Sequence, residues 1–510
     1  MTSPSTVNDF TLPEDLEDIV RRLWYGIERR RWDLQLRDLY YNGEQAMRQL
    51  GIALPPQIRH LRTTVGWPAI AVESLEDRLD IEGFTAGDDD GSAAEDLWSI
   101  WLANDMLAEA SLAHLYALIF GHSYVTIGAS DGDGYGDDPS GPLAPPDGSP
   151  IVSIDSPMDM SADWDARTRQ VRFALRRYRV DDEDGATLYT PNGNYFLIQQ
   201  SGIGGWQVVD IDDHNLGVTL VERLSNRERS NDRVGKSEIT AEVMSLTDAA
   251  CRTLVGAEVA REFFGAPQRY ILGASEDAFQ NADGTKKSAW ETYLGRVLAL
   301  ERDEDGNIPQ VGQFAAGDPS TYTKVRDMYA TEFAARLGLP MSYVGFTTVN
   351  PASADAIHAG EGRLIKRAER RQACFAGDWA RVGRKVLLVA NAGAGAASTP
   401  QVRPIWRDAS TPTAAAMADA TVKLVGAGIL PAESDITLRR AGLRADEIAQ
   451  VKIDRKRSEG AQVLAELTNS LVVKEARAEH ALDEATGIQP GGGPGGGGPS
   501  GGGGQAPTKP

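Results

Sequence analysis

The sequence contains few of the features that mark secreted, metal-binding or membrane-spanning proteins. Cysteine is scarce: Cys251 and Cys374 are the only two in 510 residues, and they stand outside any CxxC or Cys/His spacing. This pattern excludes a disulfide framework and a structural zinc site of the usual spacing. No apolar run reaches the length that spans a bilayer, and Met1–Val20 lacks a basic region followed by apolar residues. We therefore expect a protein of a reducing cytoplasm, with no membrane association.

Positive charge is also in short supply. The 52 Lys and Arg residues face 73 Asp and Glu residues, which gives a formal net charge of -21. Such an acidic chain is poorly suited to gripping a nucleic acid over its whole surface. It is compatible with a nucleic acid that slides past the protein, because an acidic wall repels phosphate. The apolar fraction of 41% is sufficient for one large or several ordinary hydrophobic cores.

Helical periodicity dominates both ends of the chain. Apolar residues at three- and four-residue steps predict helices at 12–50, around 72–79, at 93–120, at 237–264, at 318–338, at 350–390 and over much of 413–486. Asp318–Pro319 and Asn350–Pro351 are typical helix starts, because Asp and Asn cap free amides and Pro suits the first helical turn. Four glycines at 360, 362, 377 and 383 predict kinks or close helix contacts in the long helix after Asn350.

The middle of the chain is typical of strands. After a Gly-, Pro- and Asp-rich loop at 131–148, short runs rich in β-branched and aromatic residues occupy 151–154, 171–178, 195–199 and 206–211. Asp184–Gly185 and Asn192–Gly193 lie between some of these runs and suit tight hairpins. The fold class predicted is therefore α+β, predominantly helical, with an antiparallel sheet. A small α/β insertion is expected at 266–317 and a flexible Gly/Pro-rich tail at 488–510.

No catalytic or cofactor motif is complete. The stretch Ser230–Ser237, SNDRVGKS, matches a phosphate-binding loop except that its first Gly is a Ser, and charged residues at 222–229 stand where a buried strand should precede it. We expect a helix start at Gly235–Ser237 instead. The Asp-rich loop at 131–138 lacks essential calcium ligands, and the six histidines form no HExxH pattern. The sequence predicts no cofactor, no metal site and no enzyme activity, with a nucleotide hydrolase as an alternative.

A basic stripe is the one charged constellation that calls for a partner. Residues 353–392 contain eight Lys or Arg against four Asp or Glu. Five of the cations follow i, i+3, i+4, i+7, i+8 spacing and are expected to share one helix face: Arg363, Lys366, Arg367, Arg370 and Arg371. Three interpretations stay open. The stripe pairs with acids of the same chain, it meets a neighbouring subunit, or it contacts phosphate transiently.

The order of these elements resembles the portal proteins of tailed bacteriophages over nearly the whole chain. The similarity is greatest to portals of siphophages of actinobacteria, through the segments Val65–Phe84, Ser156–Tyr178 and Asn350–Arg371. The resemblance implies a wing at 1–234, stem helices at 235–265 and 318–337, a clip at 266–317, a channel loop at 338–352, a long kinked wing-to-crown helix and its connection at 353–410, a helical crown at 411–487 and a tail at 488–510.

The resemblance also implies a function and a set of partners. About twelve subunits would form a ring at one capsid vertex, through which double-stranded DNA passes without sequence specificity during packaging and ejection. The expected partners are the large terminase subunit, the major capsid and scaffolding proteins, and the head-completion or adaptor proteins. The protein would reside in the virion after assembly in the host cytoplasm. The channel loop would present these residues to DNA: Ser342, Tyr343, Phe346, Thr347, Thr348, Val349 and Asn350. A monomeric structural scaffold is the alternative without a ring.

Overall fold

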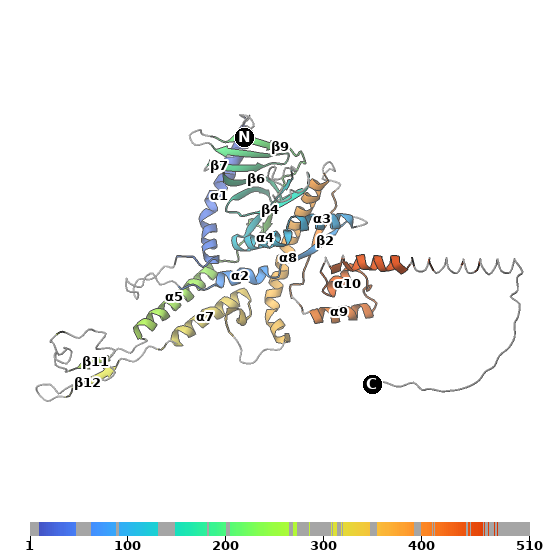
Figure 1. The fold of residues 1–510 in the computed structure, drawn as a ribbon. Coiled ribbons are helices and arrows are strands. Elements are labelled where there is room, and N and C mark those ends of the chain that lie inside the picture. Colours follow the sequence, from blue (N-terminus) through green and yellow to red (C-terminus); the bar gives the residue numbers. More distant parts are fainter. Residues whose placement is uncertain are drawn as a thin grey trace, which may run out of the picture. The chain divides into compact units, whose positions relative to one another are not determined.

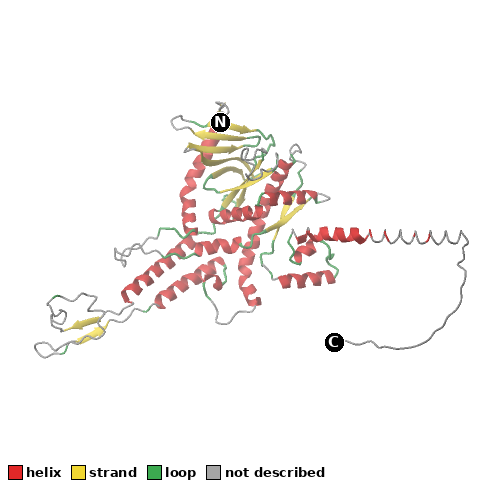
Figure 2. Cartoon of the chain, viewed as in Figure 1, coloured by secondary structure: helices red, strands yellow, loops and turns green. Residues whose placement is uncertain are grey.

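The computed structural model describes residues 10–46, 63–87, 91–130, 148–180, 183–199, 205–264, 269–272, 310–313, 320–346, 354–391, 399–410, 414–444 and 450–462, with some single positions between them. The chain divides into two compact units, Met1–Pro412 and Thr413–Pro510. The described residues form helices and antiparallel strands, and helices predominate (Figure 2). The α+β class predicted from the sequence is confirmed. Most of the α/β insertion expected at 266–317 and the whole tail at 488–510 lie outside the described residues.

The helices of the first unit form mostly where the periodicity predicts them. They are α1 (Glu14–Tyr41), α2 (Trp67–Glu76), α3 (Ser92–Ala103), α4 (Met106–Phe120), α5 (Ala241–Phe264), α7 (Ser320–Leu337) and α8 (Ala354–Ala390) (Figure 1). The predicted cap of α7 is confirmed, since the Asp318 carboxylate accepts a hydrogen bond from the Ser320 amide at 2.9 Å. Gly338 ends this helix with a φ of +65°, a conformation that glycine adopts without strain.

The single helix predicted at 93–120 is wrong, because the chain breaks between α3 and α4. Asp105 adopts a φ of +52° at the break. The Asn104 amide group donates to Pro150 O at 3.0 Å and accepts from Val152 N at 2.9 Å. These bonds join the break to a strand that lies far away in the sequence. The interruption is therefore fixed by tertiary contacts that helical periodicity does not record.

Two antiparallel sheets form the β-rich middle of the first unit. Their strand orders are β1-β9-β8-β7-β6-β5 and β10-β3-β4. The bounds are β1 (Phe10–Thr11), β3 (His122–Ala129), β4 (Pro150–Asp155), β5 (Met160–Asp165), β6 (Gln170–Val180), β7 (Glu183–Tyr189), β8 (Asn194–Gln199), β9 (Gln207–Asp212) and β10 (Val221–Ser225). The runs predicted as one sheet fall into two, because β4 pairs with β3 and not with β5.

Of the two Gly-containing dipeptides predicted to form hairpin turns, only one does so. Asn192–Gly193 forms the predicted tight connection between β7 and β8, where Thr190 N donates to Gly193 O at 3.0 Å. Gly185 instead lies inside β7, opposite Tyr178 of β6. A Cβ at this position would come within 2.6 Å of the Tyr178 ring. Glycine is therefore required there by the aromatic ring that covers it, and the prediction of a turn at Asp184–Gly185 is wrong.

Strand β10 corrects the expectation that charge excludes a buried strand before SNDRVGKS. Glu222 in this strand is 0% exposed, and its carboxylate accepts from Arg381 Nε at 2.8 Å and from Lys385 Nζ at 2.9 Å. Arg223 is also buried, with its guanidinium 4.3 Å from the Trp164 ring centroid. Burial of charge is tolerated here because each charge has a partner. The helix start expected at 235–237 is also wrong, since α5 begins at Ala241.

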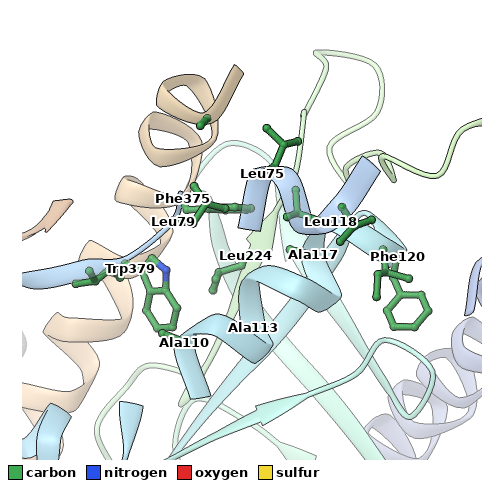
Figure 3. Close-up of a cluster of buried hydrophobic side chains, with 14 of the residues drawn as sticks. Leu75, Leu79, Ala110, Ala113, Ala117, Leu118, Phe120, Leu224, Phe375 and Trp379 are labelled. Carbon is green, nitrogen blue, oxygen red and sulfur yellow. The ribbon is translucent and has the colours of Figure 1, made fainter. Parts of the chain in front are cut away.

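The main hydrophobic core lies where α2, α4, α8 and β10 meet. Figure 3 shows part of it, with the labelled side chains Leu75, Leu79, Ala110, Ala113, Ala117, Leu118, Phe120, Leu224, Phe375 and Trp379. Trp379 of α8 is fully buried, and its Nε1 donates to His114 Nε2 of α4 at 2.8 Å. This cluster fixes the C-terminal half of α8 against α4 and the smaller sheet.

Two strand pairs and the second unit complete the described chain. Strands β2 (Ile81–Ala86) and β13 (Val402–Trp406) pair, as do β11 (Arg269–Leu272) and β12 (Gln310–Gln313). The second unit contains α9 (Ala414–Gly426), α10 (Asp435–Arg440) and helical residues at 450–462. Gly428 and Gly442, both with positive φ, lie just after the C-terminal ends of α9 and α10. Each described helix is too short or too polar to cross a membrane.

Candidate functional site

The connection between α7 and α8 carries the residues expected to face DNA. It includes one turn of 3-10 helix, η3 (Met341–Val344), in which Val344 is buried. Phe346 is half-buried and packs against the main core. Ser342 and Tyr343 lie on the exposed side, and residues 347–350 lie outside the described part of the chain. The described half of this loop is thus anchored on the core through Val344 and Phe346, and Ser342 and Tyr343 remain partly accessible to solvent.

Arg78, which follows α2, connects this loop to three other segments. Its buried guanidinium donates to Ala409 O at 2.6 Å through Nη1, while Nη2 lies 3.2 Å from both Tyr343 Oη and Glu361 Oε2. Tyr343 Oη donates in turn to Glu361 Oε1 at 3.1 Å. The Arg78 carbonyl accepts from Gln372 Nε2 at 2.9 Å. The Arg78 cluster therefore fixes the base of the loop to the N-terminal half of α8 and to the chain after β13.

The residues of the predicted basic stripe do not share one environment. Arg367 and Arg371 point inward to Glu238, which is 1% exposed, with Nη2···Oε distances of 2.8 and 2.6 Å. For these two residues the structure shows pairing with an acid of the same chain. Burial alone would raise the pKa of Glu238, but Arg371, Arg367 and the Asn226 amide together outweigh it and lower the pKa. Glu238 is therefore a charged link between α8 and the loop before α5.

The other three cations of the stripe lie on the exposed side of α8. Arg363 Nη1 donates to Ala335 O at 2.9 Å, at the C-terminal end of α7. Lys366 Nζ lies 2.6 Å from Glu369 Oε2 on the same helix. Arg370 is exposed. These side chains are accessible to a neighbouring subunit or to phosphate, so that part of the hypothesis stays a prediction.

A second ionic cluster holds the C-terminal half of α8 on β10. It contains the Glu222 pairs with Arg381 and Lys385, and Asp378, whose Oδ2 accepts from Ser225 N at 3.1 Å. Burial raises the pKa of Asp378 to about 7, although Arg381 at 2.5 Å opposes the shift. Periodicity gave no sign of this cluster, since Glu222 and its partners stand about 160 positions apart.

The SNDRVGKS segment does not offer a phosphate cradle. The Lys236 amide of the segment donates to Asn226 O at 2.7 Å. Just after the segment, the amides of Glu238 and Ile239 donate to Leu118 O and Ser237 Oγ, both at 2.9 Å. Phosphate binding requires free amides at a helix N-terminus. The described residues also contain no group of three or more His, Cys, Asp or Glu side chains placed to hold a metal ion.

Comparison with known proteins identifies the class to which this architecture belongs. The family model described as phage portal protein, SPP1 Gp6-like, matches residues 20–459, from α1 to the helical part of the second unit. The chain belongs to this family of phage portal proteins.

Two curated relatives place it more narrowly. The portal protein of Mycobacterium phage D29 is 37% identical over 399 residues, which cover 77% of this chain and 79% of the relative. The portal protein of Mycobacterium phage L5 is 36% identical over 408 residues, covering 79% and 81%. A solved structure titled "Neck of native GTA particle computed with C12 symmetry" aligns with a TM-score of 0.39 and 14% identity, over 80% of this chain and 99% of that chain. The resemblance inferred from the sequence is confirmed by the family and its curated members.

Proposed function

We propose that this protein forms a ring at one vertex of a phage capsid and that the centre of the ring is the channel for genome packaging and ejection. The observation that carries the proposal is the portal-family match, which includes both units of the chain. About twelve subunits of charge -21 would give the assembly ~250 negative charges, which favours DNA that slides over DNA that adheres.

The regional roles follow the observed elements. α5 and α7 lie side by side (Figure 1) and would form the stem, with the β11–β12 pair between them in sequence as the clip. Residues 1–234 would be the wing, 353–410 the wing-to-crown helix with its connection, and 411–487 the crown. An isolated two-stranded ribbon is marginally stable in water, and Leu272 of β11 is 58% exposed. The clip is therefore expected to pack on neighbouring copies or on a docked protein.

The segment at 338–352 would be the loop that faces DNA. Its described half supports this proposal by geometry: Val344 and Phe346 anchor the segment, Tyr343 is bound to Arg78 and Glu361 through its hydroxyl, and Ser342 is exposed. Contacts to DNA from this loop, including Thr347–Asn350, would be van der Waals and neutral polar contacts. Such contacts do not depend on base sequence.

The remaining partners and the expected lack of catalytic activity belong to the same proposal. The large terminase subunit would supply the energy for packaging, and capsid, scaffolding and head-completion proteins would bind the outer surfaces. The protein itself would have no catalytic role, a proposal that the incomplete SNDRVGKS motif and the commitment of the Lys236 amide to Asn226 O support. Turnover of ATP by the purified protein would favour the alternative of a nucleotide hydrolase.

The first experiment is negative-stain electron microscopy with light-scattering mass on the same purified sample. Rings of about a dozen subunits with a central hole are expected, and a stable monomer across concentrations would contradict the proposal. The channel loop is tested separately by replacing Phe346 and Thr347–Asn350 with Gly. Rings should still form while DNA packaging is lost, and normal packaging by this variant would refute the role of the loop.

A further inference from the structure

Helix α1 carries an apolar stripe on its outer face. Tyr25, Trp32, Leu36 and Leu39 are 65, 84, 44 and 38% exposed. They recur at steps of seven, four and three residues and therefore share one side of the helix, opposite the buried Leu34. A tryptophan that is 84% exposed leaves a large apolar surface in water, and tryptophan is among the residues that dominate binding energy at protein interfaces. The stripe has the composition of a contact surface.

A second apolar patch lies on α3 and the start of α4. Leu102 and Leu107 are 48% and 59% exposed. The two patches stand at opposite ends of α4: Leu107 is in its first turn, while Arg37 of α1 donates to Phe120 O at its last residue. A helix of 15 residues is about 22 Å long. Figure 1 accordingly shows α4 between α1 and α3.

The two patches carry complementary charge. Arg29 lies within the α1 stripe, four residues after Tyr25, and it has no ion-pair partner among the described residues, whereas Arg22 and Arg31 are paired. Around Leu102 and Leu107 three exposed carboxylates likewise have no ion-pair partner in the described parts of the chain: Glu95, Asp96 and Asp105. One patch therefore offers apolar surface with a free cation, and the other offers apolar surface with free anions.

We infer that the α1 face of one copy docks on the α3–α4 face of the next copy, head to tail. The inference rests on the proposed ring, because only a closed ring uses two different faces of every subunit without leaving either unpaired. In this contact Trp32 packs on Leu102 and Leu107, and Arg29 faces the carboxylates around Asp105. The occupant is a second copy of the chain because the complementary surface is present on the chain itself, at the far end of α4.

The first test is Trp32→Glu, with Val209→Glu as the control. Val209 is a 43% exposed apolar residue on β9, outside both patches. We expect Trp32→Glu to keep the circular dichroism and melting temperature of the wild-type monomer but to lose the ring in light scattering, while Val209→Glu still forms rings. Rings formed by Trp32→Glu would overturn this inference and leave the proposed ring intact. A monomeric wild-type protein would overturn both.

A charge exchange separates contact from misfolding. Arg29→Glu and Asp105→Arg are each expected to weaken or abolish the ring, because each places like charges across the contact. In a head-to-tail ring an equimolar mixture of the two variants restores opposite charges at every contact and should recover rings. A failure of the mixture to recover rings lost by both single variants would contradict the pairing of these faces. So would ring formation at wild-type levels by each variant alone.

Discussion

Substitution of Glu238 by Gln tests how α8 is fixed to the loop that precedes α5. The Glu238 carboxylate is 1% exposed and accepts from Arg371 Nη2 at 2.6 Å, from Arg367 Nη2 at 2.8 Å and from Asn226 Nδ2 at 3.0 Å. Gln keeps the size of the side chain but removes the charge and turns one acceptor into a donor. Two guanidinium groups would then lie beside a neutral amide in a site that excludes most water.

The expected loss of stability follows from the burial of these partners. Removing one member of a buried ion pair costs about 3–5 kcal/mol. The side chain of Arg371 is 8% exposed and that of Arg367 is 18% exposed, so water can solvate part of the freed charge. We therefore expect a loss near the lower limit, about 3 kcal/mol. Glu242→Gln is the matched control, because Glu242 pairs with Arg336 while both are more than half exposed, and it should cost at most about 1 kcal/mol.

Urea unfolding followed by tryptophan fluorescence measures this difference. All ten tryptophans precede Thr413, so the signal reports the first unit alone. One protein concentration must be used throughout, because assembly would stabilise the folded state. A free energy of unfolding for Glu238→Gln within about 1 kcal/mol of wild type, or equal to that of Glu242→Gln, would refute the claim that the buried carboxylate holds α8 in place.

Four further substitutions test the packing of α8. Asp378→Asn should flatten the pH dependence of stability. Folding raises the pKa of Asp378 to about 7, so the wild-type protein loses stability as the pH rises from about 4 through 7. Urea midpoints of both proteins at pH 5.5 and 8 would show the difference. Trp379→Phe should cost about 1–3 kcal/mol in urea unfolding by leaving His114 Nε2 buried without its donor. Gly383→Ala should lower the melting temperature, because its Cβ would lie 2.8 Å from Leu97 Cδ2, whereas Gly377→Ala, with only a distal guanidinium atom at 3.8 Å, should raise it.

Local periodicity predicted the elements whose burial is decided along one helix or strand. α7 and α8 begin and end near the predicted residues, because apolar spacing, the Asp318 cap and Gly338 all act within a few positions. α1 begins as predicted but ends at Tyr41, well before the predicted residue 50. The break before α4 was missed, because Asn104 is held by a strand 46 to 48 positions away. β10 was missed for the same reason: its charged residues are buried only because α8 supplies their partners.

The sequence placed the candidate loop between two helices, where the structure has the α7–α8 connection, but it did not show the contacts of that loop, and the role of the loop toward DNA stays a prediction. The α7–α8 connection stands out in the sequence by its aromatic and β-branched residues between two capped helices. Arg78, which holds its base, carries no signal, because its acceptors on Tyr343 and Ala409 lie 265 and 331 positions away. The i, i+4 spacing of Arg367 and Arg371 correctly put them on one side of α8, but spacing alone cannot tell whether that side faces solvent or a buried Glu238.

The ionic contacts of α8 bear on how the loop before it is positioned. The helix is fixed at three places by charges from other segments: Glu361 by Arg78, Arg367 and Arg371 by Glu238, and Arg381 and Lys385 by Glu222. The hydrophobic effect itself lacks direction, so apolar packing resists sliding or rotation of this 37-residue helix only through the fit of its side chains. Buried ion pairs tolerate no such shift, since a displaced charge loses its partner. The described start of the α7–α8 connection is held by the same contacts, because Arg78 binds both Tyr343 of this connection and Glu361 of α8.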